Sequence, residues 1–106
     1  MKQNTNCYMV YQLPHSNQNV FRSFEDVPQP INIGDYCCVW ANDDVEFDMD
    51  DRDICEELFT RFNVAHPKGF GAHSMSVSDI IVIFRGEESR LYYCDPVGFK
   101  KINYFK

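Results

Sequence analysis

The chain has 106 residues, of which 44% are hydrophobic and 15% aromatic, and its formal net charge is −6 at pH 7. This length predicts one domain with a buried core rather than two. The sequence has no run of about 18 apolar residues and its first residues are too polar for a signal peptide, so we expect a cytoplasmic protein without a membrane span. Ten Lys and Arg against sixteen acids disfavour direct nucleic-acid binding, which needs basic surface.

The first half of the chain predicts two strands and a short helix. Residues 7–13 alternate between two sets of side chains, as a half-buried strand does. Phe21, Phe24 and Val27 follow at three-residue spacing, which indicates a helix of one or two turns that ends before a proline. After a turn at residues 32–35, the uninterrupted apolar run at residues 36–40 predicts a second strand, compatible with a central place in the sheet.

One longer helix is predicted at residues 52–63. Its apolar face is formed by residues at relative positions 1, 5, 6 and 9: Ile54, Leu58, Phe59 and Phe62. Asp50 or Asp51 is suited to cap its first turn, and Arg61 lies near its end, where a positive charge is favourable.

The second half of the chain predicts a loop followed by three strands. Pro67, Gly69 and Gly71 mark the loop, and a β-branched run at residues 80–84 predicts a central strand. Turns at residues 85–89 and 95–98 separate this run from strands at residues 91–94 and 99–102. We therefore expect one small α+β domain over residues 1–106, with a mainly antiparallel sheet of four to five strands, one main helix and one short helix.

Two features of composition bear on function. The five cysteines are odd in number and lack CxxC spacing, which favours reduced, buried thiols. Between residues 43 and 57 there are nine carboxylates and one arginine, so this segment carries −8 and the remainder +2. A solvated loop before a favourably charged helix start explains the pattern most simply.

The same acidic segment also has functional interpretations. As an acidic interaction face it would steer a basic protein partner, and its members are Asp43, Asp44, Glu46, Asp48 and Asp50. It could also mimic nucleic-acid phosphates and occupy the groove of a DNA-binding protein. A calcium loop starting at Glu46 is disfavoured, because Asp51 stands where such a loop needs glycine.

The loop at residues 66–79 contains groups that could perform chemistry. His73, three serines and Asp79 are the ingredients of a nucleophilic triad, but the sequence has no GxSxG elbow. His66 and His73 match no common zinc spacing, so we expect no metal, cofactor or catalytic residue. The short polar side chains are better explained as bonding the backbone that leads into the strand. The candidate binding residues of this loop are His66, Phe70, His73, Ser76, Ser78 and Asp79.

Two long motifs carry a resemblance to a known family. HPKGFGAHSMSVSDIIVI at residues 66–83 and YYCDPVGFKKI at residues 92–102 resemble the signature of the YodL-like domain family, and YMVYQL and DYCCVW match its looser N-terminal half. The resemblance implies a small bacterial domain, a cytoplasmic setting and a mobile-element or phage context. It supplies no established catalytic residues. We therefore expect a non-enzymatic protein-interaction module, with a nucleic-acid mimic and an enzyme using the 66–79 loop as alternatives.

Overall fold

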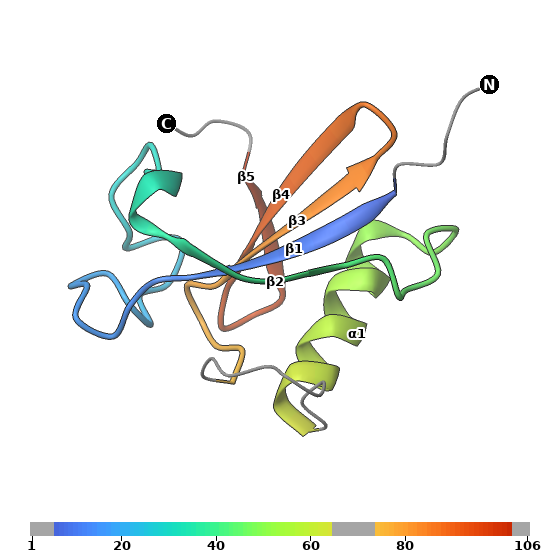
Figure 1. Cartoon of the computed structure of the whole chain (residues 1–106). Helices are drawn as coiled ribbons and strands as arrows, with labels where there is room; N and C mark the ends of the chain where they lie inside the picture. The colour runs from blue at the N-terminus through green and yellow to red at the C-terminus, as the bar shows by residue number, and fades with distance from the viewer. Residues whose placement is uncertain (1–5, 65–73, 103–106) are drawn as a thin grey trace.

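The computed structural model describes residues 6–64 and 74–102, which form one antiparallel sheet and one main helix (Figure 1). The strands follow the order β2-β1-β3-β4-β5 across the sheet. In chain order the elements are β1 (Cys7–Gln12), the 3-10 turn η1 (Ile33–Asp35), β2 (Cys37–Asn42), α1 (Asp51–Val64), β3 (Ile80–Arg85), β4 (Glu88–Cys94) and β5 (Phe99–Ile102). The predicted α+β fold, with a mainly antiparallel sheet and one main helix, is confirmed, and the short helical element is the 3-10 turn η1.

The central strand of the sheet is β3, as its sequence predicts. Ile80 to Ile83 are all buried, because the two faces of β3 are both covered. On one side β3 pairs with β1, where Tyr8 lies opposite Ile83. On the other side it forms the predicted hairpin with β4. Gly86 has a φ of +66° in the connecting turn, a conformation that glycine adopts without steric cost.

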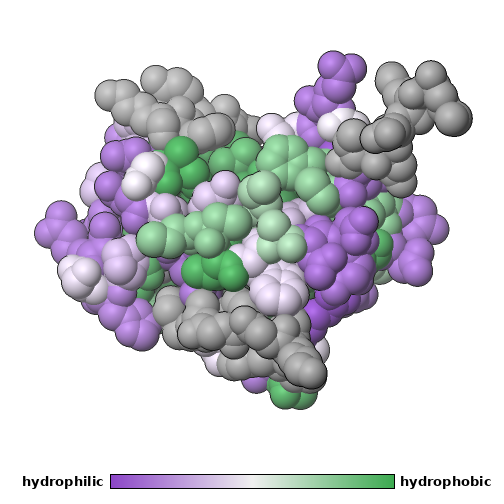
Figure 2. Space-filling view, in the orientation of Figure 1, coloured by the Kyte–Doolittle hydropathy of each residue, from purple (hydrophilic) through white to green (hydrophobic). Residues whose placement is uncertain are grey.

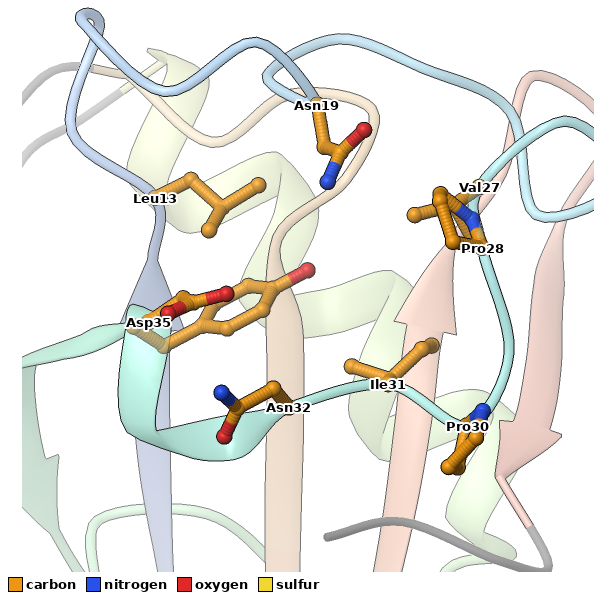
Figure 3. Close-up of a pocket in the computed structure, with 9 residues that line it drawn as sticks. Leu13, Asn19, Val27, Pro28, Pro30, Ile31, Asn32 and Asp35 are labelled. Atoms are coloured by element: carbon orange, nitrogen blue, oxygen red, sulfur yellow. The ribbon is translucent and has the colours of Figure 1, made fainter.

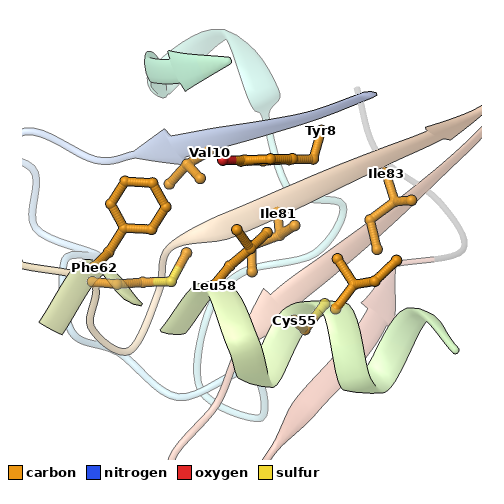
Figure 4. Close-up of a cluster of buried hydrophobic side chains, with 9 residues drawn as sticks. Tyr8, Val10, Cys55, Leu58, Phe62, Ile81 and Ile83 are labelled. Carbon is orange, nitrogen blue, oxygen red and sulfur yellow. The ribbon is translucent and has the colours of Figure 1, made fainter. Parts of the chain in front are cut away.

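One face of the sheet packs against α1. Figure 4 shows side chains from β1, β3 and α1 pointing toward one another in this core. The alternation of each strand selects the inward residues, and the 3.6-residue period of the helix selects its own. The buried members are Tyr8, Val10, Ile54, Cys55, Leu58, Phe62, Met75, Ile81 and Ile83. The predicted apolar face of the helix is therefore the face that meets the sheet.

The opposite face of the sheet is covered by the segment between β1 and β2, drawn in blue to teal in Figure 1. Leu13, Val27, Ile31 and Tyr36 from this segment and its ends are buried against strand residues such as Val82. The chain thus builds its second layer from turns rather than from a second helix.

The short helix predicted around residues 21–27 does not form there. Phe21 has a φ of +66°, which is incompatible with a right-handed helix. Its backbone N–H donates to Ser78 Oγ at 3.0 Å, and the Phe24 N–H donates to Asp95 Oδ1 at 2.8 Å. These long-range bonds take the place of helical ones. The short helix lies instead at η1, where Asn32 Oδ1 accepts the Gly34 N–H at 3.0 Å.

The second strand is not central, contrary to one reading of its apolar sequence. Within the described ranges β2 pairs with β1 alone and forms an edge of the sheet. Cys37 and Cys38 are consequently exposed, which corrects the expectation that the cysteines are mostly buried. Cys55 and Cys94 do lie in the core, and burial raises the pKa of the Cys94 thiol to about 12, so both are unreactive packing groups.

The core predicts a clear difference between two substitutions. Leu58→Ala removes a fully buried side chain between the helix and the sheet, and should lower the free energy of unfolding by about 2–5 kcal/mol. Val97→Ala changes a side chain that is 81% exposed and should stay within about 0.5 kcal/mol of wild type. Urea denaturation measures both, and equal losses would contradict the assignment of the core.

Candidate functional site

Ser78 and Asp79 form a fully buried junction at the start of β3. Asp79 Oδ2 accepts hydrogen bonds from Gln12 Nε2 at 3.0 Å and from the Ser76 backbone N–H at 2.9 Å. The Asp79 carbonyl accepts the Cys94 N–H at 2.8 Å. One residue therefore connects the end of β1, the loop before β3 and the end of β4. We call the two residues the Ser78–Asp79 junction.

Ser78 extends this junction to the segment that covers the sheet. Its Oγ accepts the Phe21 N–H at 3.0 Å, and its carbonyl accepts the Tyr36 hydroxyl at 2.9 Å. Burial raises the pKa of Tyr36, so this hydroxyl stays protonated and acts as a donor. Ser78 has a φ of +88°, a strained conformation for a serine that these bonds hold in place.

This geometry assigns a structural task to the described part of the 66–79 loop. Ser78 Oγ accepts a backbone N–H and is buried, so it is not presented as a nucleophile beside a base. Ser76 is half-buried and contributes its backbone to the junction. His66, Phe70 and His73 lie outside the described residues. Ligand binding by this loop therefore stays a prediction.

The acidic interaction face follows an alternating pattern along the chain. Its five members, Asp43, Asp44, Glu46, Asp48 and Asp50, are all exposed. The residues between them, Val45, Phe47 and Met49, are partly buried and pack against the core. Arg85 fixes the backbone of this segment, because its guanidinium donates to the carbonyls of Phe47 and Met49. The acidic side chains thus project from an anchored segment.

Asp44 differs from the other four carboxylates because it bonds strongly within the chain. Its Oδ1 accepts the Tyr8 hydroxyl at 2.7 Å and Arg61 Nη1 at 2.8 Å. Partial burial raises the pKa of Asp44, but the hydrogen bonds from Tyr8 and Arg61 outweigh it and the net shift is downward. The remaining four make no ion pair with any residue in the described ranges. Their negative charge therefore lies at the surface.

Sequence reasoning missed the role of Asp51, the first residue of α1. Its carboxylate accepts Arg85 Nη2 at 2.8 Å, Arg90 Nη1 at 3.1 Å and the Tyr92 hydroxyl. Burial raises the pKa of Asp51, yet these three donors outweigh burial and hold the pKa below its usual value. The side chain therefore ties the helix start to the β3–β4 hairpin rather than capping its own helix. Two arginines and a tyrosine on neighbouring strands were the only trace of this in the sequence.

The hollows of the structure are small. The cavity in Figure 3, of about 140 Å³, lies within the segment that joins β1 to β2 and is lined by residues such as Leu13, Val27 and Tyr36. Two others, of about 250 and 210 Å³, share Gly98 and Phe99 in their walls.

Among residues 6–64 and 74–102, no three His, Cys, Asp or Glu side chains converge as a metal site. The calcium-loop spacing is interrupted too, because α1 begins at Asp51.

The fold and the junction define a small α+β domain whose SxSD motif, Ser76 to Asp79, is built into the start of the central strand. The sequence model of the YodL-like domain matches residues 7–105, so this chain belongs to the YodL-like domain family. Comparisons with curated proteins and with solved structures gave no match. No helix in the described part of the chain is long and apolar enough to cross a membrane.

Asp51 and its three donors, Arg85, Arg90 and Tyr92, are called the Asp51 cluster, and they predict a specific dependence of stability on pH. Since its pKa is lower in the folded state, Asp51 contributes stability above its unfolded pKa of about 4, and this contribution is lost as the pH falls through the folded pKa. Asp51→Asn should cost about 1–3 kcal/mol at pH 7, and this cost should decrease steadily as the pH is lowered from 4 to 2. Urea denaturation of both proteins between these pH values measures the difference. A constant difference across the range would contradict the assignment.

Proposed function

We propose that this chain is a non-enzymatic protein-interaction module that uses its acidic interaction face to recognise a basic partner. The observation that carries the proposal is the anchored acidic segment, in which Asp43, Glu46, Asp48 and Asp50 project from a backbone held by Arg85. Fixed charges of one sign steer an oppositely charged partner and select against partners of the same sign. A segment already fixed also loses little conformational entropy on binding.

The surroundings of the acidic segment support this proposal. The sequence has no Lys or Arg between Arg22 and Arg52, so no basic residue of that stretch neutralises the segment. Of the nearby bases, Arg61 is bonded to Asp44 and Glu57, and Arg85 to Asp51. Within the described residues, Asp43, Glu46, Asp48 and Asp50 therefore form no ion pair that would offset their negative charge.

A second candidate is an inhibitor that mimics nucleic-acid phosphates and occupies the basic groove of a DNA-binding protein. The same stretch without Lys or Arg favours it, because such a groove selects continuous negative charge. The enzyme alternative gains no support from Ser78 and Asp79, whose described bonds are structural. We also propose a bacterial cytoplasmic setting in a mobile-element or phage context, which is what the resemblance to the YodL-like family implies.

An affinity pull-down from a bacterial host tests the proposed function. The test variant carries Asp43→Asn, Glu46→Gln and Asp48→Asn, and keeps Asp44 because its carboxylate bonds Tyr8 and Arg61. The control variant neutralises the same number of exposed acids elsewhere, at Glu25, Asp26 and Glu87. We expect the test variant to lose a basic partner that the wild type and the control retain. Equal retention, or equal loss by both variants, would contradict recognition through this face.

A further inference from the structure

The two edges of the sheet are protected to different degrees. The β5 edge has four residues, and two of them are the exposed Lys100 and Lys101. Short length and lysines are devices by which proteins keep an edge strand from pairing with other chains. The β2 edge has six residues, Cys37 to Asn42, with no charged residue and no proline. Among the described strands β2 pairs with β1 alone, so of the two edges it is the less protected against pairing.

The side chains of β2 are suited to contact with another strand. Cys37, Cys38 and Ala41 are exposed, small and uncharged. A register shift opposite Val10 and Tyr11 places a bulge at Val39, which limits regular pairing to short stretches on either side of it. An incoming strand would therefore be short.

The apolar surface continues from β2 onto the sheet. Ala41 lies opposite Met9 and Cys38 lies opposite Tyr11, so each pair shares a face. Met9, Tyr11 and Phe84 on that face are only partly buried. Figure 2 shows apolar side chains gathered in the middle of the view, over β1 and β2. A strand added at β2 would extend this face and bury more of it.

Charge indicates which partner fits the edge. The exposed carboxylates of Asp35 and Asp43 flank β2 at its two ends, and no Lys or Arg occurs between Arg22 and Arg52. A second copy of this chain would bring its own net charge of −6 to the same place. A strand with an apolar middle and basic ends would complement the edge at both ends.

We propose that β2 is a docking edge where a basic partner adds an extended segment to the sheet by antiparallel or parallel strand pairing. The backbone of the segment would bond the outer edge of β2, its apolar side chains would lie beside Cys38 and Ala41, and its basic ends would meet Asp35 and Asp43. The inference rests on the proposed function, because it names how the partner recognised by the acidic interaction face is bound.

Titration of the isotopically labelled protein with a synthetic peptide tests the inference by NMR under reducing conditions. The peptide has a core of alternating valine and threonine and two lysines at each end, and a control peptide carries glutamates at the ends. We expect amide shifts and new protection from hydrogen exchange in residues 37–42, and binding at least about tenfold weaker for the control peptide. Shifts centred on β5 or α1, or no binding, would overturn the proposal.

Two variants of equal charge separate pairing from simple attraction. Ala41→Lys places a lysine on the open edge, whereas Val97→Lys adds the same charge at the exposed turn before β5. We expect Ala41→Lys to weaken binding of the lysine-ended peptide by about tenfold, and Val97→Lys to have a much smaller effect on this binding. Equal effects, or a dimer of the free protein that Ala41→Lys dissociates, would overturn the assignment. If the peptide does not bind but capture of the partner in the pull-down still depends on the acidic residues, the strand-addition inference is wrong and the proposed function stands.

Discussion

The structure depends on the hydrogen bonds of the Ser78–Asp79 junction, which bring two neighbouring strands and the segment that covers the sheet to one point at the start of β3. Asp79 connects β1 and β4 to the start of β3, and Ser78 connects the segment covering the sheet to the same point. Both side chains are fully buried, so losing one of these bonds costs more than losing a similar bond at the surface. The covering segment has little regular structure of its own, and the junction is one of the few places where it is bonded to the sheet.

In this arrangement the motif that holds the fold is buried, and the surfaces proposed for recognition are exposed. The SxSD motif faces inward, where it fixes the backbone and the start of the central strand. The acidic interaction face and the β2 edge lie at the surface, and they adjoin along the chain between Cys37 and Asp50. The Asp51 cluster holds the start of α1 and shares Arg85 with the backbone of the acidic segment. The exposed carboxylates at residues 43–50 take no part in the hydrogen bonds described for the junction.

Local patterns predicted the elements whose structure depends on local sequence. The apolar face of α1, the β-branched run of β3 and the turn at Gly86 were all evident, and the acidic residues were correctly expected at the surface. The edge position of β2 was not evident, because an apolar run has the same composition at the edge of a sheet as at its centre. Only the pairing of the strands decides between the two positions. The region around Phe21 was predicted as a helix from the spacing of its apolar residues. That spacing carries no information about Ser78 and Asp95, which are distant in the sequence and bond the backbone of this region. The donors to Asp51 escaped prediction for the same reason.

The most direct test of this account is to measure the free energy of unfolding and partner binding together for Ser78→Ala and Asp79→Ala. If the junction serves the fold, each substitution lowers the free energy of unfolding by about 1–3 kcal/mol, because Phe21 N–H or Gln12 Nε2 loses its acceptor. Binding of the captured partner, measured well below each melting temperature, should equal that of wild type. A variant with wild-type stability that no longer binds the partner would contradict the account and make the junction part of the recognition site.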